Sequence, residues 1–397
     1  MPVTVLDIEA THEPVTIVLP HGYTHAAGLV RWRGRPIGQV SVQAREGAID
    51  ADTLRQALAD AVASQVAEEQ VREYLDWHDA RPLSLPAAVP ATVAICTRDR
   101  LDDLAHCLTA MDGLPDDGQE VLVVDNASHA GDAVRALTAR HRQARYVRED
   151  RPGLDIARNR ALREARGDIV VFCDDDATVD THWLRALARN FDDPRTLCAT
   201  GLTLPLELES EAQEWFERTN SFTRGVRRIV HDGAVHDAFF VSRVGAGVNM
   251  ALRRTVLELV GPFDEALDAG TPTKSGGDHD MFTRILLGGY CIVYDPEAVS
   301  WHRHRREWSG LRDTVHGYGT GVWAYLTKQL LAGELRAPYV ALAWLRWQLR
   351  GLAHALAGRP AHLRRDLIVA ELRGCLAGPG AYRRSRRLAR ASGDTRP

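Results

Sequence analysis

The sequence predicts an α/β fold in which helices cover a mostly parallel, Rossmann-like sheet. Within residues 91–310, short apolar strand patterns alternate with helical patterns, as expected of βαβ units. Residues 81–90 contain three prolines, so they predict a linker rather than a helix or a central strand. Around these segments we expect a small α+β domain over residues 1–80 and a helical, arginine-rich extension over residues 311–397.

In the first of these domains, branched and apolar residues predict short strands, and an apolar spacing near the helical period predicts one helix. The strands are expected at 15–20, 27–33 and 36–42, and the helix at about 52–77. No residue pattern assigns a chemistry to this domain, so its role stays open.

The central domain is expected to begin with strands that are connected by helices. The strands are expected at 92–96, 120–124, 144–149 and 168–173, and the helices at 101–111, 131–141 and 154–165. In such sheets, ligands bind beyond the carboxyl ends of the strands. Asp125 and Asp174–Asp176 both lie at strand ends, so we expect them to contribute to one site.

The last 87 residues (311–397) are mostly helical by pattern. Residues 339–357 are rich in Trp, Leu and Ala, and arginines are frequent from residue 364 onward. Two interpretations are open. The segment is either an amphipathic helical cap with a basic tail, or an attachment to an anionic membrane surface through Trp and Arg.

Composition excludes several classes of protein. Hydrophobic residues make up 45% of the 397 residues, which is enough for a sizeable core and argues against global disorder. Lys and Arg number 49 against 53 Asp and Glu, so a protein that binds nucleic acid through phosphate neutralisation is not expected. The six cysteines form no Cys-x-x-Cys pair, which argues against a disulfide framework and a zinc cluster.

The same sequence bears on location. No apolar run approaches the roughly 20 residues that span a bilayer, and residues 1–10 lack the features of a signal peptide. We therefore expect a reduced, cytoplasmic protein, with peripheral membrane attachment through the C-terminal extension as the alternative.

An acidic cluster follows the apolar strand pattern of residues 169–173. Adjacent carboxylates at the end of a buried strand repel one another and resist desolvation, and a divalent cation relieves both costs. Mg²⁺ and Mn²⁺ bind carboxylates together with phosphate oxygens. Asp174–Asp176 therefore predict a metal site, and the alternative is a solvated acidic turn at a helix N-cap.

Three other side chains are candidates for chemistry. Asp278 follows two glycines and opens an apolar helical pattern, so it is either a general base or a plain N-cap. Asp125 either accepts bonds from a base or ribose or caps the next helix. His302 is either a metal ligand or a structural hydrogen-bonding residue.

Taken together, these segments resemble the family-2 glycosyltransferases over about residues 91–306, a little over half of the chain. Each motif is weak alone, but their order and spacing are specific. The segments that carry the resemblance are Val93–Arg100, Val123–Ser128, Gly153–Leu162, Asp174–Asp176, Gly245–Met250, Gly261–Asp264 and Asp278–Met281.

The resemblance implies a GT-A fold, a nucleotide-diphosphate sugar donor and a divalent cation, Mg²⁺ or Mn²⁺. By matching position, it implies Asp176 as a metal ligand and Asp278 as the catalytic base, with Asp280 as the rival. His302 is expected to help Asp176 hold the metal. The resemblance also implies that the donor contacts are Thr97, Arg98, Asp99, Asp125, Arg158, Asp174, Asp175, Gly245 and Asn249.

Two departures from the family pattern matter. Gly277 stands where the family often has Glu before the catalytic Asp, and no Gln-x-x-Arg-Trp motif follows. The lack of a Gln-x-x-Arg-Trp motif, together with the lack of membrane-spanning helices, favours transfer of a single sugar over processive synthesis. The chain is thus expected to be an inverting, non-processive enzyme of the hexosyltransferase type.

Several properties stay open at this stage. The acceptor is expected to be a sugar, a lipid-linked compound or a natural product, and aromatic residues between 204 and 241 could contact it or pack under a lid. The donor base, the sugar and the oligomeric state are not predicted. The alternative function is a non-catalytic protein of the same fold that binds a nucleotide sugar or a carbohydrate.

Overall fold

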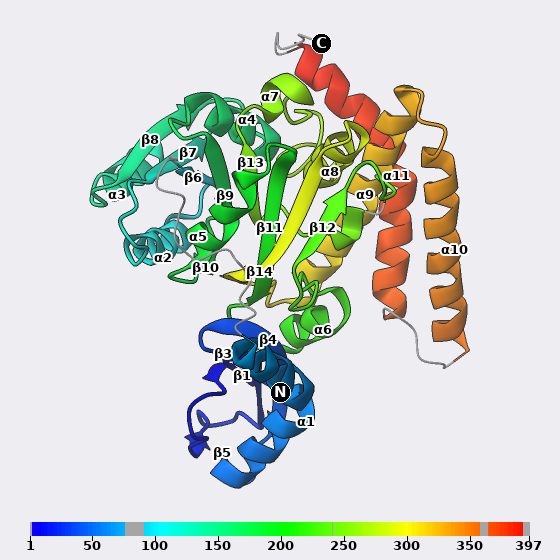
Figure 1. Cartoon of the computed structure of the whole chain (residues 1–397). Helices are drawn as coiled ribbons and strands as arrows, with labels where there is room; N and C mark the ends of the chain where they lie inside the picture. The colour runs from blue at the N-terminus through cyan, green and yellow to red at the C-terminus, as the bar shows by residue number, and fades with distance from the viewer. Residues whose placement is uncertain (1, 76–90, 240, 358–363, 392–397) are drawn as a thin grey trace.

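The computed structural model describes residues 2–75, 91–239, 241–357 and 364–391. It contains a small N-terminal domain, a central α/β domain and a C-terminal group of long helices (Figure 1). The predicted linker over residues 81–90 lies outside the described residues.

The N-terminal domain is a three-stranded sheet covered by one helix. Its strands are β1 (Val3–Glu9), β3 (His25–Trp32) and β4 (Arg35–Gln43), in the order β1-β3-β4, and β2 (Ile17–Val18) pairs with β5 (Ala48–Ile49). Helix α1 (Ala51–Tyr74) buries Leu54, Leu58 and Val62 against this sheet. Strand β1 escapes sequence-based prediction because Asp7 and Glu9 interrupt its apolar pattern.

This domain contacts the central domain through both charged and apolar side chains. Arg31 pairs with Asp180 at 2.9 Å, and Arg35 pairs with Glu297 at 3.1 Å. Leu29 is fully buried in a cluster with side chains of the central sheet: Leu202, Leu204, Val299 and Trp301. The N-terminal sheet is therefore packed against the edge of the central domain.

The central sheet has nine strands within the described residues, in the order β10-β14-β11-β13-β9-β6-β7-β8, with β12 paired to β14. The strands are β6 (Ala91–Thr97), β7 (Glu120–Asn126), β8 (Ala144–Glu149), β9 (Ile169–Asp174), β10 (Ala177–Val179), β11 (Thr196–Pro205), β12 (Ile229–Asp232), β13 (Asn249–Arg253) and β14 (Cys291–His302). Strands β6 to β9 are parallel as predicted, and β13, β10 and β12 add antiparallel pairs.

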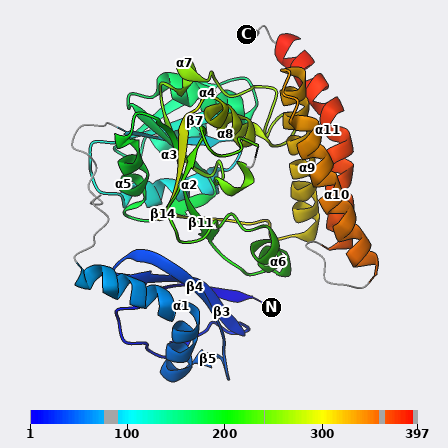
Figure 2. The ribbon, with the colours of Figure 1, turned by 45° about the vertical axis from the view of Figure 1, so that its right-hand side comes forward.

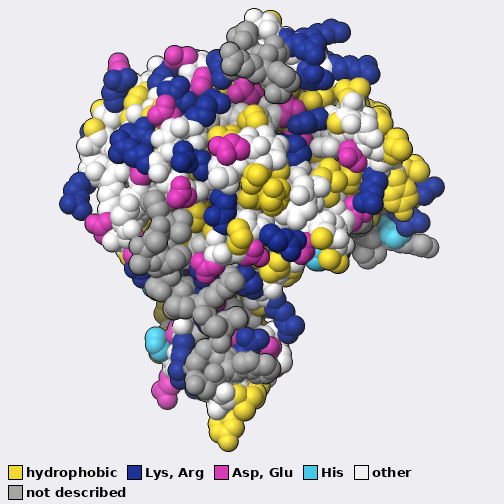
Figure 3. Space-filling view, turned by 45° about the horizontal axis from the view of Figure 1, so that its top comes forward, with side chains coloured by type: hydrophobic (Ala, Val, Ile, Leu, Met, Phe, Trp, Pro, Cys, Tyr) yellow, Lys and Arg dark blue, Asp and Glu magenta, His cyan; other side chains and the backbone are white. Residues whose placement is uncertain are grey.

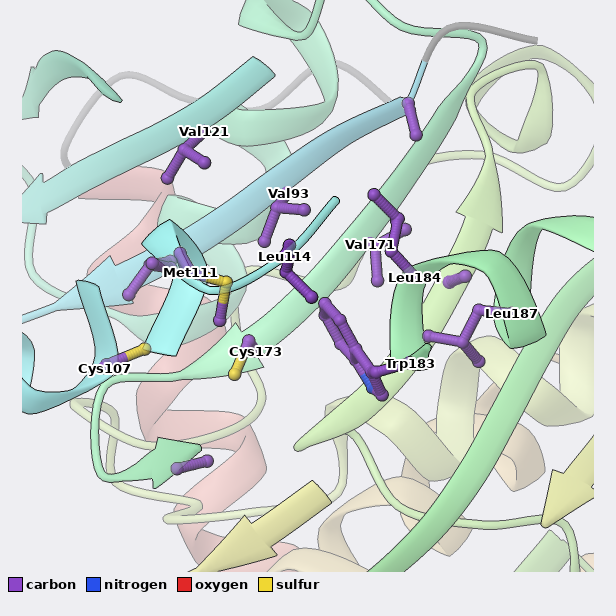
Figure 4. Packing of buried hydrophobic residues seen from close by; sticks show 14 of the residues in the cluster. Val93, Cys107, Met111, Leu114, Val121, Val171, Cys173, Trp183, Leu184 and Leu187 are labelled. Carbon is purple, nitrogen blue, oxygen red and sulfur yellow. The ribbon is translucent and has the colours of Figure 1, made fainter. Parts of the chain in front are cut away.

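Helices cover both faces of this sheet. One face packs on α2 (Leu101–Asp112), α3 (Gly131–Thr138) and α5 (Trp183–Ala188), and the other packs on α4 (Leu154–Glu164) and α8 (Gly277–Leu287). Trp183 is fully buried in the first layer, where Figure 4 shows it among Leu114, Val171 and Leu187. The shorter helical segments are α6 (Glu211–Asn220), α7 (Val256–Leu259), and 3₁₀ turns at Arg189–Asp192 and Val241–Arg243.

The C-terminal extension consists of α9 (Trp308–Leu331), α10 (Ala337–Leu356) and α11 (Arg365–Ala391), which lie side by side (Figure 2). Glycines let α9 and α11 approach closely, because a Cβ on Gly319 would lie 2.3 Å from the Glu371 carbonyl oxygen. Helix α9 is also held against the loop before α8, where a Cβ on Gly321 would lie 2.0 Å from Ser275 Oγ. Among the described residues, no helix combines the length and the apolar character that crossing a membrane requires.

Candidate active site

The carboxyl ends of β9 and β14 bring two aspartates and a histidine together. Asp174 is the last residue of β9 and His302 is the last residue of β14. Strand β10 pairs with β14 so that Ala177 lies opposite His302, which brings the preceding Asp176 to the imidazole. Asp176 Oδ1 lies 3.1 Å from His302 Nε2.

These three side chains form a donor set that fits a divalent cation. One potential ligand atom from each of Asp174, Asp176 and His302 lies within 4.8 Å of the others. The Nδ1 atom of His302 is buried and has no hydrogen-bond partner, so this ring nitrogen is available to a ligand. The two carboxylates suit Mg²⁺ or Mn²⁺, and the imidazole adds a nitrogen ligand.

The charge state of this trio is set by burial and by its neighbours. Burial raises the pKa of Asp174, and the nearby Asp176 raises it further. Burial alone would raise the pKa of Asp176 too, but His302 and Arg100 hold it below its usual range. The pKa values of the two carboxyl groups are thus shifted in opposite directions, which indicates a crowded acidic site that a cation would stabilise.

Asp175 is held by the last residue of the first strand of the domain and by Arg100, which also bonds to Asp176. It accepts hydrogen bonds from Thr97 Oγ1 at 2.8 Å and from Arg100 Nη1 at 3.1 Å. Burial raises its pKa to about 7, although Arg100 opposes this shift. The predicted donor contacts Thr97 and Asp175 thus bond to one another.

A cavity of about 690 Å³ adjoins the donor set. Its lining includes Asp174 and His302 of the donor set together with Arg158, Gly245 and Asp278. The cavity wall is completed by Tyr318 of α9, Trp344 and Trp347 of α10, Glu371 of α11, and Phe216 and Phe222 from α6 and the segment after it. The C-terminal extension therefore forms part of the site.

Asp278 is held by backbone and side-chain donors at the start of α8. Its Oδ2 accepts the backbone N–H of Gly247 at 3.1 Å, and its Oδ1 accepts the backbone N–H of His279 at 2.8 Å and lies 3.0 Å from His279 Nδ1. Burial alone would raise the pKa of Asp278, but the His279 ring holds it well below its usual range. These contacts therefore favour the ionised form of the Asp278 carboxyl.

Arg158 lines the cavity from a buried position on α4. Its Nη1 donates to Asp155 at 3.0 Å and to Asp268 at 2.8 Å, and its guanidinium lies 5.5 Å from the centre of the Phe263 ring. Only 4% of Arg158 is exposed, so its orientation is fixed by these contacts. Arg158 is the donor contact that was predicted on α4, and it lines the same cavity as Asp278.

Asp280 and Asn249, both site candidates from the sequence, do not line the cavity. Asp280 is fully buried and accepts bonds from Arg284, Lys328 and Gln329, so it joins α8 to α9. Asn249 is also fully buried and accepts the indole N–H of Trp183 at 2.9 Å. Its amide nitrogen donates to Leu202, Ala298 and Ser300.

The remaining nucleotide candidates lie at the ends of β6 and β7, outside the cavity lining. Asp125 is buried and accepts bonds from Tyr146, Arg148 and the backbone of Ser128. Asp99 has a positive φ of 56° and accepts the backbone N–H of His129 at 2.7 Å. The neighbouring Arg98 side chain is exposed, with Nε 3.9 Å from Asp99 Oδ2.

Several cavity residues were not anticipated from the sequence. His279 lies within the motif segment Asp278–Met281, and Asp268 follows the segment Gly261–Asp264, so their positions offered a signal. Tyr318, Trp344 and Glu371 belong to the C-terminal helices, and no sequence pattern connects them to the acidic motifs. Their contribution depends on how the helices pack.

Comparison with known sequences decides the family. The sequence pattern described as glycosyl transferase family 2 matches residues 92–260. The succinoglycan biosynthesis protein ExoM of Rhizobium meliloti is 31% identical over 254 residues, which cover 57% of this chain and 76% of ExoM. The chain belongs to glycosyl transferase family 2. With the α/β sheet described above, whose strands β6 to β9 are parallel, this membership confirms the expected GT-A fold.

Two further proteins are similar to this family-2 member, one a curated sequence and the other a solved structure. The pre-mycofactocin glycosyltransferase of Mycobacterium tuberculosis is 29% identical over 258 residues, so the chain spans about half (51%) of that relative's length. A mannosyltransferase structure from Pyrobaculum calidifontis, in complex with GDP-Man and Mn²⁺, has a TM-score of 0.47 and 19% identity over 82% of both chains. The family match includes Arg158 and Asp174–Asp176, and it ends before Asp278 and His302.

Proposed function

We propose that the chain transfers one sugar from a nucleotide-diphosphate sugar to an acceptor hydroxyl, with inversion at the anomeric carbon. One observation supports this most directly: two members of the metal donor set, Asp174 and His302, line the same cavity as Asp278. Transfer of this kind requires a group that stabilises a leaving diphosphate and a base that activates the acceptor, both within reach of one substrate.

The leaving-group side is assigned to the trio and its cationic neighbours. Asp174, Asp176 and His302 would hold Mg²⁺ or Mn²⁺. When bound, such an ion stabilises negative charge on phosphate oxygens as a Lewis acid. Cationic side chains line the same cavity and would add to this effect: Arg158, Arg224, Lys274, Arg303 and Arg305.

The acceptor side is assigned to Asp278. Its ionised carboxylate would orient the acceptor hydroxyl and take its proton while the hydroxyl oxygen attacks the anomeric carbon. A single displacement needs one carboxylate and no covalent intermediate, so an α-linked donor would give a β-linked product. The three bonds that Asp280 accepts from Arg284, Lys328 and Gln329 favour a positioning role for Asp280.

The base and ribose contacts remain proposals. Asp99 and Asp125 would meet the nucleoside, together with Thr97, Arg98 and Asp175, at the ends of β6, β7 and β9. Gly245 lines the cavity and would meet the sugar through its backbone, and the fold requires glycine here because a Cβ would lie 2.5 Å from Thr200. Asn249 is instead assigned a structural role, because its amide is used by protein partners.

The test begins with a thermal-shift screen of nucleotide sugars with and without Mn²⁺, since a donor that binds the native state raises its melting temperature. With that donor, Asp278→Asn should keep donor binding and lower transfer by about 10²–10⁴-fold. Asp132→Asn, which changes an exposed carboxylate on α3, is the matched control. Retention of near-normal transfer by Asp278→Asn would refute the assignment of the base.

Two further measurements separate the alternatives. The anomeric configuration of the product, read by NMR, distinguishes inversion from retention. A parent chain that binds a donor but neither transfers nor hydrolyses it would instead support the non-catalytic nucleotide-sugar or carbohydrate-binding protein.

A further inference from the structure

The outer face of α10 exposes large apolar side chains at helical spacing. Tyr339 is 73% exposed, Leu342 45%, Leu349 49% and Leu356 60%. Their spacing of three, seven and seven residues places them on one stripe of the helix. The opposite stripe is packed, since Val340, Ala341 and Trp344 contact one apolar cluster and Leu352 and Ala355 another. A face turned only toward water would carry polar side chains there instead.

The charge of the same face is entirely positive. Residues 335–357 contain no Asp or Glu, and the exposed Arg346 and Arg350 lie among the exposed apolar side chains. On the right-hand edge of Figure 3, where α10 lies in Figure 1, yellow side chains border dark blue ones. Leu, Trp and Tyr combined with Arg, without acidic residues, are typical of helices that lie in the interface of an anionic bilayer.

This face is connected to the active-site cavity through a tryptophan. A hollow of about 250 Å³ on α10 is lined by Tyr339, Leu342, Ala343, Arg346, Trp347 and Arg350. Trp347 also lines the cavity that contains Asp278. The side chain that borders the outer hollow therefore also borders the site where an acceptor would react.

We propose that α10 docks on an anionic lipid surface and that the cavity accepts the hydroxyl of an acceptor anchored in that surface. The acceptor class rests on the glycosyl transfer proposed above, whereas the docking does not. The apolar stripe would enter the region between head groups and acyl chains, and Arg346 and Arg350 would meet lipid phosphates. The acceptor head would reach Asp278 past Trp347.

The charge pattern favours a lipid surface over a second copy of the chain. In a symmetric dimer built on this face, the same stripe would meet itself. Arg346 and Arg350 would then oppose arginines, and α10 contains no carboxylate to neutralise them. An anionic bilayer offers the complementary charge and an apolar layer together.

Flotation of the full chain with lipid vesicles tests the docking. The parent should float with vesicles of phosphatidylcholine and phosphatidylglycerol and not with phosphatidylcholine alone, and added salt should weaken the binding. Leu349→Glu should lower the partition coefficient by about tenfold or more, because the new carboxylate enters the interface. Leu259→Glu, on α7 and with a similar exposure of 48%, should float like the parent.

Several results would overturn the proposal. The first is that the parent stays in solution in the presence of anionic vesicles. The second is that the Leu349→Glu variant floats as well as the parent. The third is that light scattering shows a dimer that dissociates in the Leu349→Glu variant, which would assign the face to a second copy.

Activity assays address the acceptor class separately. Leu349→Glu should transfer normally to a short water-soluble acceptor and at least about tenfold more slowly to a lipid-linked acceptor in anionic vesicles. Equal loss with both acceptors, or no loss with either, would contradict a membrane-borne acceptor. Flotation without transfer to any acceptor would leave the docking in place and reject the proposed enzyme.

Discussion

The carboxyl group of Asp155 fills the space beside Gly277, since a Cβ atom on Gly277 would lie 2.1 Å from Asp155 Oδ2. Asp155 is fully buried on α4, and only its Oδ1 has a partner, the guanidinium of Arg158. Burial, reinforced by Asp268, raises the pKa of Asp155 well above its usual range. The space that a side chain at position 277 would enter is thus occupied by a carboxyl group that comes from a different helix.

We expect Gly277→Ala to lower the free energy of unfolding by about 1–3 kcal/mol, because the methyl group overpacks against Asp155. In Asp155→Ala/Gly277→Ala, the loss should be smaller than the sum of the single losses by about 0.5–3 kcal/mol. Urea denaturation of the four proteins measures this coupling.

Gly380→Ala is the control for this cycle. It lies in α11, and its Cβ would meet nothing within 4 Å, so it should not destabilise the protein. If the losses in unfolding free energy from Asp155→Ala and Gly277→Ala were strictly additive, the two positions would not compete for the same space.

A second prediction concerns the metal. Mn²⁺ should bind the parent in isothermal titration, and His302→Gln should weaken binding by about 100-fold or more, because even outer-shell changes cost 10–100-fold. The imidazole is one of three ligand groups, so its loss leaves an incomplete donor set. His106→Gln, which changes an exposed histidine on α2, should bind Mn²⁺ like the parent. Equal affinities for parent and His302→Gln would remove His302 from the site.

Sequence analysis could predict the site residues that lie at the ends of strands or at the start of a helix. Asp174 follows an apolar strand, and parallel strands bring their carboxyl ends to the same edge of the sheet. Asp278 was predicted because a helix start is visible in the sequence. In both cases, local patterns determine where the side chain lies.

The unpredicted part depends on packing between distant segments. Glu371 reaches the cavity only because glycines allow α11 to approach α9, and such contacts have no local signal. The family resemblance implied Asn249 as a donor contact, yet Trp183 of α5 donates to its amide oxygen. Which partner a polar side chain takes is decided by the three-dimensional packing around it.

A third prediction concerns Glu371, which is 6% exposed on α11. Burial raises the pKa of its carboxyl from 4.5 to about 7. Between these values the unfolded chain loses the proton while the folded chain keeps it, so the free energy of unfolding falls as pH rises. The fall should approach about 1.4 kcal/mol per pH unit and end above pH 7.

Glu371→Gln should remove this contribution, so its unfolding free energy should decline less between pH 4.5 and 7 than that of the parent. Urea denaturation at a series of pH values measures the difference between the two proteins. Glu334→Gln, in the α9–α10 connection, is the matched control. Parallel pH profiles for parent and Glu371→Gln would show that the buried carboxyl does not titrate in this range.

The fourth prediction separates structural from ligand-binding roles at Asn249. Asn249→Ala would leave the indole N–H of Trp183 and the carbonyl of Ala298 without partners in a dry interior. Each unsatisfied buried group costs about 1–3 kcal/mol, so the free energy of unfolding should fall by about 2–4 kcal/mol. At temperatures where the variant is folded, its affinity for a nucleoside diphosphate and Mn²⁺ should match that of the parent. The opposite result, normal stability with lost nucleotide binding, would return Asn249 to the donor site.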